Sequence, residues 1–326
     1  MPNFVYWKLP EFPEIYTIRE PTEINLTEFT NRNEGFVLFP FSKAKDGKLF
    51  QGKIETIPSN KLVFPNITSK SVYQTSSAQD YHALVLKALE QIEVGIFKKV
   101  VLAQTASLQL NDKFILKDFF DNLCQTYPNA FIYCLALENE IWIGASPEVF
   151  LKKAKNSYQT YALAGTRHVD TNTQFGTKEQ NEQAFVRDYI VQKITEVGSK
   201  SIQVSELHEV NTGNLWHLIN IITFENQNPI EIIRTLHPTP AICGFPLHKS
   251  LEFINRNEPI DREYYAGYLG PISNTGDFSL WVNLRCAKIS EPNIFFYAGA
   301  GIVAGSNPEA ERLETERKMD TLRQLI

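Results

Sequence analysis

Two pairs of glutamates are spaced so that each pair could lie on one face of a helix. One pair is Glu179 and Glu182, and the other is Glu311 and Glu314, which Lys318 follows one turn later. Side chains three, four and seven positions apart share a helix face, so each segment would present its carboxylates together. Four carboxylates on two facing helices would suit a hard cation such as Mg²⁺, which prefers oxygen ligands. Taken singly, either pair is more typical of a solvated helix with ordinary salt bridges.

A glycine-rich segment precedes the second of these helices. Gly299 and Gly301 follow an apolar run at 293–297 that predicts a buried strand. Glycines let a backbone approach a ligand closely, and the next helix, capped by Ser306 or Asn307, would add its N-terminus, so the segment suggests a pocket for an anion. A dinucleotide-binding fingerprint needs a βαβ unit with an acidic residue about 20 residues on, and the sequence after Gly301 is too short for one.

Two adjacent lysines lie in an apolar segment at 96–104 that predicts a strand. Alternation along a strand puts Lys98 and Lys99 on opposite faces, so only one of them points the same way as Val101. Both could be edge residues that discourage pairing with another chain. Alternatively, one enters a pocket, where loss of water would lower its pKa toward that of a usable base. The spacing alone does not choose between these alternatives.

Other charged residues are expected beside apolar strands. Glu148 closes the segment after the predicted strand at 140–144, a position that is usually at the surface but that also lines pockets in enzymes. Arg285 lies inside the segment 278–287, which predicts a strand, so its guanidinium needs an anion or a carboxylate as a partner. His217 is a lone histidine, and such residues are more often structural than catalytic.

The composition is that of a globular protein and excludes several function classes. The chain has 326 residues, of which 43% are hydrophobic and 12% aromatic. A net charge of -5 gives no electrostatic case for binding nucleic acid. No apolar run reaches the roughly 18 residues of a membrane span, and the N-terminus lacks the pattern of a secretory signal. The four cysteines have no CxxC pairing, which predicts reduced thiols in a cytoplasmic protein.

These residues must be positioned by strands and helices of one domain, 1–326. Residues 1–75 predict a β-rich N-terminal part and 76–326 a core that carries the chemistry, with no repeat or clear linker between them. The predicted helices are 81–93, 117–126, 177–198, 246–254 and one that begins at 308. The predicted strands are 35–41, 49–54, 96–104, 131–137, 140–144, 158–164, 278–287 and 293–297.

Several spaced segments together resemble the motifs of the chorismate-utilising enzymes. This family includes anthranilate synthase large subunits, aminodeoxychorismate synthases, salicylate synthases and isochorismate synthases. The segments, in this order, are KVVLA at 99–103, GASPE at 144–148, LAGT at 163–166, KEQNE at 178–182, HPTPA at 237–241, YAG at 265–267, LR at 284–285 and AGAGIV at 298–303. The resemblance runs from about residue 75 to the C-terminus, and several spaced motifs in the family's order make it specific for the family.

Within the family the chain resembles the isochorismate synthases. Lys99 stands where isomerases and salicylate synthases carry the lysine that activates water, which the ammonia-using anthranilate synthases lack. Ala164 occupies the place of the nucleophilic lysine of aminodeoxychorismate synthases. Ala241 matches an alanine of isochorismate synthases, where salicylate synthases tend to have threonine.

The resemblance implies a fold, a cofactor and a set of site residues. It implies an α/β fold of the α+β type, with large antiparallel sheets in a two-layer core, helices outside and a deep cleft, in a monomeric Mg²⁺ enzyme. Lys99 would be the general base and Glu148 the general acid. Glu182 and Glu314 would bind the metal directly, with Glu179 and Glu311 holding metal-bound waters. The implied substrate-binding residues are Gly165, Thr166, His217, Ala241, Tyr265, Arg285, Gly301 and Lys318.

The implied reaction is the isomerisation of chorismate to isochorismate, feeding menaquinone synthesis or, alternatively, a siderophore pathway. Water adds at C2 and the C4 hydroxyl leaves, which requires a neutral Lys99 and a protonated Glu148, and burial shifts both pKa values in those directions. A salicylate synthase and a non-catalytic binding protein of the same fold are the alternatives. Two residues depart from the family pattern: Gln183 replaces a histidine after the metal-ligand glutamate, and Gln104 replaces an arginine.

Overall fold

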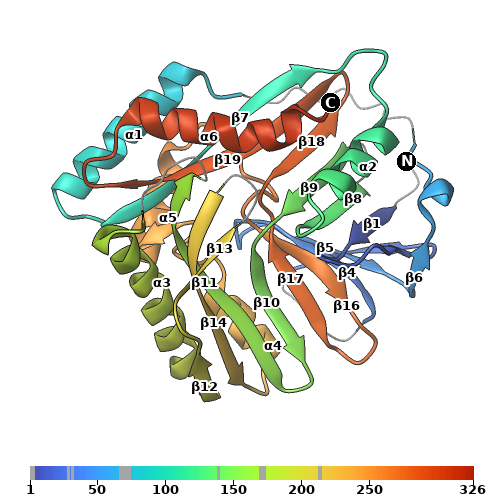
Figure 1. Cartoon of the computed structure of the whole chain (residues 1–326), viewed down its shortest axis with the longest axis horizontal. Helices are drawn as coiled ribbons and strands as arrows, with labels where there is room; N and C mark the ends of the chain where they lie inside the picture. The colour runs from blue at the N-terminus through green and yellow to red at the C-terminus, as the bar shows by residue number, and fades with distance from the viewer. Residues whose placement is uncertain are drawn as a thin grey trace.

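The structure is a computed structural model, and it describes residues 4–27, 30, 33–65, 75–137, 140–168, 174–211 and 215–326. Two large sheets dominate it, and every pairing between described strands is antiparallel. The helices lie outside the sheets (Figure 1). The predicted α/β fold with large antiparallel sheets is therefore confirmed.

One sheet has nine strands and the other has ten. The order of the first is β15 (Gly244–Phe245), β7 (Lys99–Gln109), β19 (Asn293–Val303), β18 (Cys286–Ser290), β9 (Glu140–Ser146), β8 (Phe131–Leu137), β1 (Val5–Lys8), β2 (Ile15–Ile18) and β6 (Ile54–Ile57). The order of the second is β12 (Lys200–Val204), β14 (Leu215–Glu225), β11 (Ser157–His168), β10 (Val149–Ala154), β17 (Phe278–Val282), β16 (Tyr268–Ile272), β4 (Gly35–Phe39), β5 (Gly47–Gln51) and β3 (Thr22–Leu26), with β13 (His208–Asn211) also paired to β14.

The sheets pack face to face around the main core. Phe131 of the first sheet stacks on Trp281 of the second, with 4.0 Å between the ring centroids. Alternation along β8 explains its unbroken apolar run, because Phe131 and Tyr133 face this core while Ile132 and Cys134 face a second core on the other side of the sheet. Because β8 is buried on both faces, none of its side chains faces water and all of its positions can be apolar.

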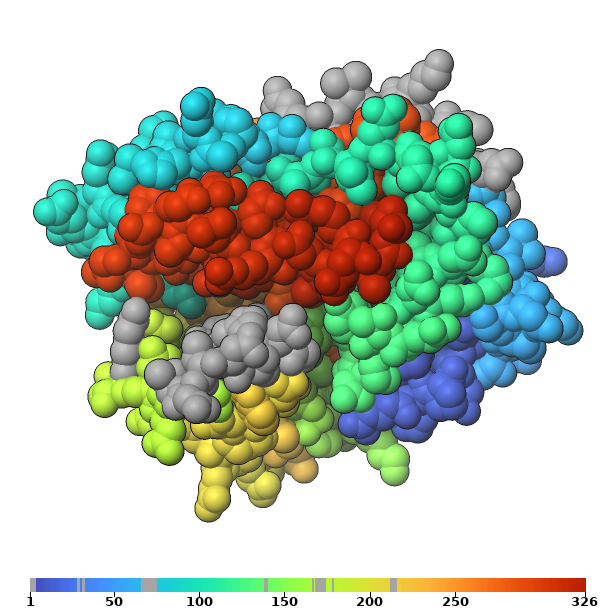
Figure 2. Space-filling model, turned by 45° about the horizontal axis from the view of Figure 1, so that its top comes forward, coloured from blue at the N-terminus to red at the C-terminus, as the bar shows by residue number. Residues whose placement is uncertain are grey.

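Six α-helices and one short 3₁₀ helix are described. They are α1 (Ala78–Glu93), α2 (Leu116–Thr126), α3 (Thr177–Glu196), α4 (Pro229–Leu236), α5 (Leu247–Asn257), α6 (Pro308–Arg323) and η1 (Ser59–Lys61). Helix α6 lies over β19 and β7 with α1 beside it, while α3 packs on β11 and β14 of the other sheet (Figure 1). The surface recedes between α6 and the segments of the ten-stranded sheet below it (Figure 2). None of the described helices is long and apolar enough to cross a membrane.

Two predicted strands are each divided between the two sheets. The segment 278–287 is β17 in the ten-stranded sheet and β18 in the nine-stranded sheet, so Arg285 lies at the crossing between sheets and not inside a strand. The segment 49–54 divides at Gly52, where φ of 154° turns the chain from β5 into β6. Apolar residues continue across both breaks, so the pattern could not reveal them.

Three other predicted strands extend further than expected. The strand predicted at 96–104 is β7, which begins at Lys99 and continues to Gln109. Strand β11 continues past Ala164 through a bulge at Gly165, whose φ of 72° favours glycine, and ends at His168. Strand β19 continues to Val303, because its glycines keep their places in the ladder: Gly301 lies opposite Val101 of β7. Residues 299–303 of the glycine-rich segment are therefore part of strand β19 and not of a loop.

Candidate active site

A cavity of about 440 Å³ lies where the two sheets, α3 and α6 meet. It is lined by all of the predicted site residues except Thr166, whose side chain lies outside the part of the structure that is described. These residues come from segments as far apart in the chain as Lys99 and Lys318. The fold thus brings together the residues that the motifs named separately.

Lys99 is the lysine of the adjacent pair that enters the cavity, whereas Lys98 is exposed. Strand alternation puts Lys99 on the same face as Val101, which also lines the cavity. A Cβ on Gly301 would lie 2.9 Å from Lys99 Cε, so the missing side chain leaves the space that the lysine occupies. Burial lowers the pKa of Lys99, and the neighbouring Glu182 carboxylate opposes that shift.

Glu148 lies where the chain passes from β9 of one sheet to β10 of the other. Its backbone is fixed on both sides, because its carbonyl accepts from Val282 N–H at 3.0 Å and its N–H donates to Ser146 Oγ at 3.4 Å. Burial raises the pKa of Glu148 to about 7, against the opposing charges of Lys99 and Lys318. The same loss of water therefore favours the neutral form of Glu148 and the neutral form of Lys99.

Arg285 is held in an uncommon backbone conformation at the crossing between the sheets. Its φ is 48°, which a residue with a side chain adopts only where the surroundings impose it, and its carbonyl accepts from Ala145 N–H at 2.9 Å. Its Nη1 is buried and has no hydrogen-bond partner among the described residues. A buried guanidinium donor without a partner, in the wall of a cavity, is suited to an anionic ligand.

His217 and Gly165 lie on paired strands at the α3 side of the cavity. Burial lowers the pKa of His217 to about 4, and the charges of Arg285 and Lys318 add to this, so its imidazole is neutral at physiological pH. A Cβ on Gly165 would lie 3.1 Å from Glu179 Cβ, so a glycine there lets β11 pack closely on α3. Ala241 and the buried Tyr265 also line the cavity.

The four predicted carboxylates project from α3 and α6 into the same cavity. Glu314 is bound to Lys318 Nζ at 2.6 Å, and Glu179 accepts from Gly176 N–H at 2.8 Å as part of the helix cap. Within the described residues no three acidic, histidine or cysteine side chains converge on one point as a metal would require. The donor set nevertheless fits a hard cation, because it is composed of oxygens and Glu314 can exchange its ammonium partner for a metal.

The two residues that depart from the family pattern are both buried behind the cavity wall. Gln183 donates to Ala162 carbonyl at 2.9 Å and to Asn220 Oδ1 at 2.8 Å, which ties α3 to β11 and β14. Gln104 donates to the Thr315 hydroxyl, which ties β7 to α6. Each glutamine therefore connects a strand to one of the helices that carry the carboxylates.

Sequence reasoning missed some of the lining. Ala266 and Tyr297 face the cavity, and Tyr297 stacks on Tyr265 with 5.7 Å between the ring centroids. Ala266 has a φ of 59° and follows Tyr265 in the YAG motif. Its place in that motif is the sequence feature that could have identified it as a site residue. Tyr297 lies in an apolar run that indicates only a buried strand.

Comparison with known proteins places the chain in a family. The family model described as chorismate binding enzyme matches residues 50–326. Isochorismate synthase DhbC of Bacillus subtilis (strain 168) is 29% identical over 266 residues, which cover 75% of this chain and 67% of that protein. Isochorismate synthase MenF of Escherichia coli (strain K12) is 31% identical over 257 residues, which cover 74% of this chain and 59% of that protein.

The fold comparison agrees with the family match. The structure of MenF, the menaquinone-specific isochorismate synthase from Escherichia coli, matches with a TM-score of 0.84 at 22% identity, covering 99% of this chain and 88% of that one. At that identity the structural likeness concerns the fold, while the family model covers most of the sequence. The chain therefore belongs to the chorismate-binding enzymes.

Proposed function

We propose that this protein is an isochorismate synthase, which isomerises chorismate to isochorismate with the help of Mg²⁺. The family match supports chorismate as the substrate, and relatives of the chain are named isochorismate synthases. The single observation that carries the proposal is the pair formed by Lys99 and Glu148. They line one cavity, and burial shifts their pKa values in opposite directions, toward a neutral amine and a protonated carboxyl.

This pair suits the exchange of one hydroxyl for another. Lys99 accepts a proton from water as the water oxygen bonds to C2, and the ring double bonds shift as the C4–O bond breaks. Glu148 gives its proton to the departing hydroxyl, which leaves as water. One water enters and one leaves, so the reaction is reversible and needs no oxidant or reductant. Each positioned acid or base contributes a factor on the order of 10² to 10⁴ to such a rate.

The remaining walls can hold a dicarboxylate. Arg285 Nη1 and the Lys318 ammonium offer positive charge, and Tyr265 and Gly301 line the same cavity. We propose that Glu182 and Glu314 bind Mg²⁺ directly and that Glu179 and Glu311 hold its waters. When bound, the ion would offset the charge of a substrate carboxylate that has left water. Without it, four acidic side chains would repel an anionic substrate.

The test is to incubate the purified protein with chorismate, with and without Mg²⁺, and to separate the products. Isochorismate that forms only with Mg²⁺ supports the proposal. Salicylate with pyruvate would assign the protein to the salicylate synthases and show that Ala241 is a poor guide. If chorismate is not converted in either condition, the proposed enzyme activity is refuted, and a non-catalytic binding protein of this fold remains as the interpretation.

We further propose that the enzyme is a cytoplasmic monomer and that its product feeds menaquinone synthesis. The scattered cysteines without CxxC pairing favour a reducing compartment. Size-exclusion chromatography with light scattering tests the monomer. Growth of a deletion strain tests the pathway: rescue by a menaquinone precursor supports it, whereas rescue by a catecholate siderophore would assign the product to iron uptake.

A further inference from the structure

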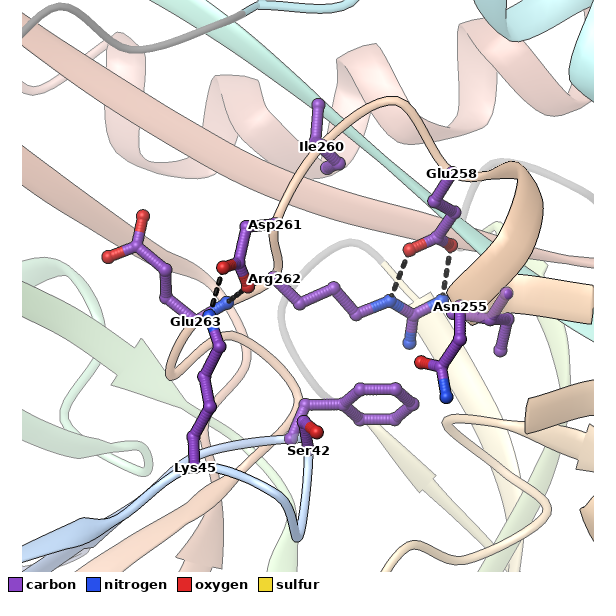
Figure 3. Close-up of a pocket in the computed structure, with 10 residues that line it drawn as sticks. Ser42, Lys45, Asn255, Glu258, Ile260, Asp261, Arg262 and Glu263 are labelled. Atoms are coloured by element: carbon purple, nitrogen blue, oxygen red, sulfur yellow. Dashed lines mark hydrogen bonds and ion pairs between the residues drawn. The ribbon is translucent and has the colours of Figure 1, made fainter. Parts of the chain in front are cut away.

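A second, smaller cavity of about 200 Å³ lies between the loop after β4 and the end of α5 with the loop that follows it, and an ion pair forms part of its wall (Figure 3). Glu258 follows the end of α5, and Arg262 lies four residues on in the next loop. Their side chains are 2% and 3% exposed, so the pair is almost fully withdrawn from water. The other charged pair at this cavity, Lys45 with Asp261, is exposed.

The buried pair is bound to the backbone of two other segments. Arg262 Nη2 donates to Val101 carbonyl at 2.6 Å, and Nη1 donates to Ile242 carbonyl at 3.0 Å. Glu258 Oε1 accepts from Ala103 N–H at 2.8 Å. Arg262 Nε also donates to Glu258 Oε2 at 2.7 Å, and the guanidinium lies 4.2 Å from the centroid of the Phe41 ring. Both charged groups therefore have several partners.

These bonds replace a missing strand at the edge of the nine-stranded sheet. Strand β15 pairs only with Lys99 and Val100, and Val101 N–H donates to Cys243 carbonyl at 2.9 Å beyond it. On the same edge, Val101 carbonyl and Ala103 N–H have the side chains of Arg262 and Glu258 as partners. Buried backbone groups at a sheet edge need such partners, and here two charged side chains supply them.

The three segments that the pair joins also form three walls of the candidate active site. Val101 lies two residues from Lys99 on β7, and Ile242 adjoins Ala241. Arg262 carbonyl accepts from Tyr265 N–H at 2.8 Å. A buried ion pair gives little net stability because its desolvation offsets its attraction, but it fixes the geometry of what it binds. Replacement of either Glu258 or Arg262 should therefore shift the walls of the candidate active site relative to one another.

We propose that Glu258 and Arg262 are positioning residues, which hold the β7 segment that carries Lys99 in register with Ala241 and Tyr265. This inference rests on the proposed function for its kinetic consequence. Neither residue lines the candidate active site, so neither touches the substrate. Their substitution should lower the rate of the chemical step and leave substrate binding nearly unchanged.

The experiment compares R262K, R262Q and E258Q with the control K48Q. Lys48 pairs with Glu23 at 2.8 Å, is less deeply buried than Arg262 and lines neither cavity. With chorismate and Mg²⁺, kcat should fall about 10-fold or more in R262Q while KM stays within about threefold, because a small displacement of a base costs rate more than binding. R262K should recover part of kcat, since an ammonium can reach one of the two carbonyls. E258Q keeps an acceptor for Ala103 N–H and should lose less than R262Q.

Hydrogen exchange gives a second measurement that does not depend on turnover. The amides of Val101 and Ala103 should exchange faster in R262Q than in the wild type, and K48Q should leave them unchanged. A kcat of R262Q within twofold of wild type, or unchanged exchange at these amides, would refute the positioning role. A wild-type protein that does not convert chorismate would refute the proposed function instead, and the exchange data would still decide the positioning role.

Discussion

Replacement of Gly301 by alanine should displace the proposed base without removing it. The new Cβ would lie 2.9 Å from Lys99 Cε and 3.5 Å from Nζ. Carbon atoms in contact prefer roughly 3.5 to 4.0 Å, so the end of Lys99 must move by about 0.6 to 1 Å. A displacement of about 1 Å at a reacting group can cost on the order of 10² in rate, so kcat of G301A should fall by about 10- to 100-fold.

The assay is isochorismate formation at saturating chorismate and Mg²⁺, together with a thermal melt. The melting temperature should change little, because the atoms that must move are the flexible end of a lysine. The control is the double variant G301A with K99A, in which the contact no longer exists. If G301A costs as much rate in the K99A background as in the wild type, the alanine acts on the substrate and not on Lys99, and the argument fails. A kcat of G301A within twofold of wild type would also refute it.

Other predictions follow from the same site. Replacement of Lys99 by alanine should lower kcat by a factor of about 10² to 10⁴, whereas replacement of the exposed Lys98 should leave kcat unchanged. Steady-state kinetics measure both variants, and the opposite result would show that Lys98 is the base. The activity of the wild type should fall as the pH rises through about 7, because Glu148 loses the proton that it must donate. The folded-state pKa of Glu148 lies above its ordinary value of 4.5, so folding gains stability from the protonated carboxyl at low pH and loses about 3 kcal/mol as the pH rises through about 7. E148Q should therefore unfold in urea with a weaker pH dependence between pH 5 and about 8 than the wild type, and equal slopes would show that Glu148 is not buried as described. E182Q and E314Q should each raise the Mg²⁺ concentration needed for half-maximal rate, and an unchanged Mg²⁺ titration would remove both from the proposed metal site.

Local patterns predicted most of the elements but not where the strands break. Helices α1, α2, α3 and α5 begin and end within a few residues of the predicted bounds, because caps and helical periodicity are properties of neighbouring residues. The apolar segment 278–287 predicts one strand that includes Arg285. Its turn from one sheet into the other depends on contacts with Ala145, which is distant in the sequence.

Motifs along the chain identified the candidate chemical groups and the resemblance to the family. The order and spacing of the motifs are local and survive in any fold, so Glu148, the carboxylate pairs and the lysine pair could be named as candidates, and the family match is consistent with them. The strand pattern does not choose between an edge residue and a pocket base for Lys98 and Lys99, because alternation states only that the two side chains face opposite ways.

Which of these groups share a cavity, and how burial shifts their pKa values, follows from the three-dimensional arrangement of the chain. Lys99, Glu148 and Arg285 come from distant segments, and their pKa shifts arise from burial, which a linear pattern does not contain. The pairing of Glu258 with Arg262 likewise had no signal, because its partners on β7 are more than a hundred residues away. Desolvation and hydrogen bonding depend on what surrounds a side chain in space, whereas periodicity and motifs record only what precedes and follows it along the chain.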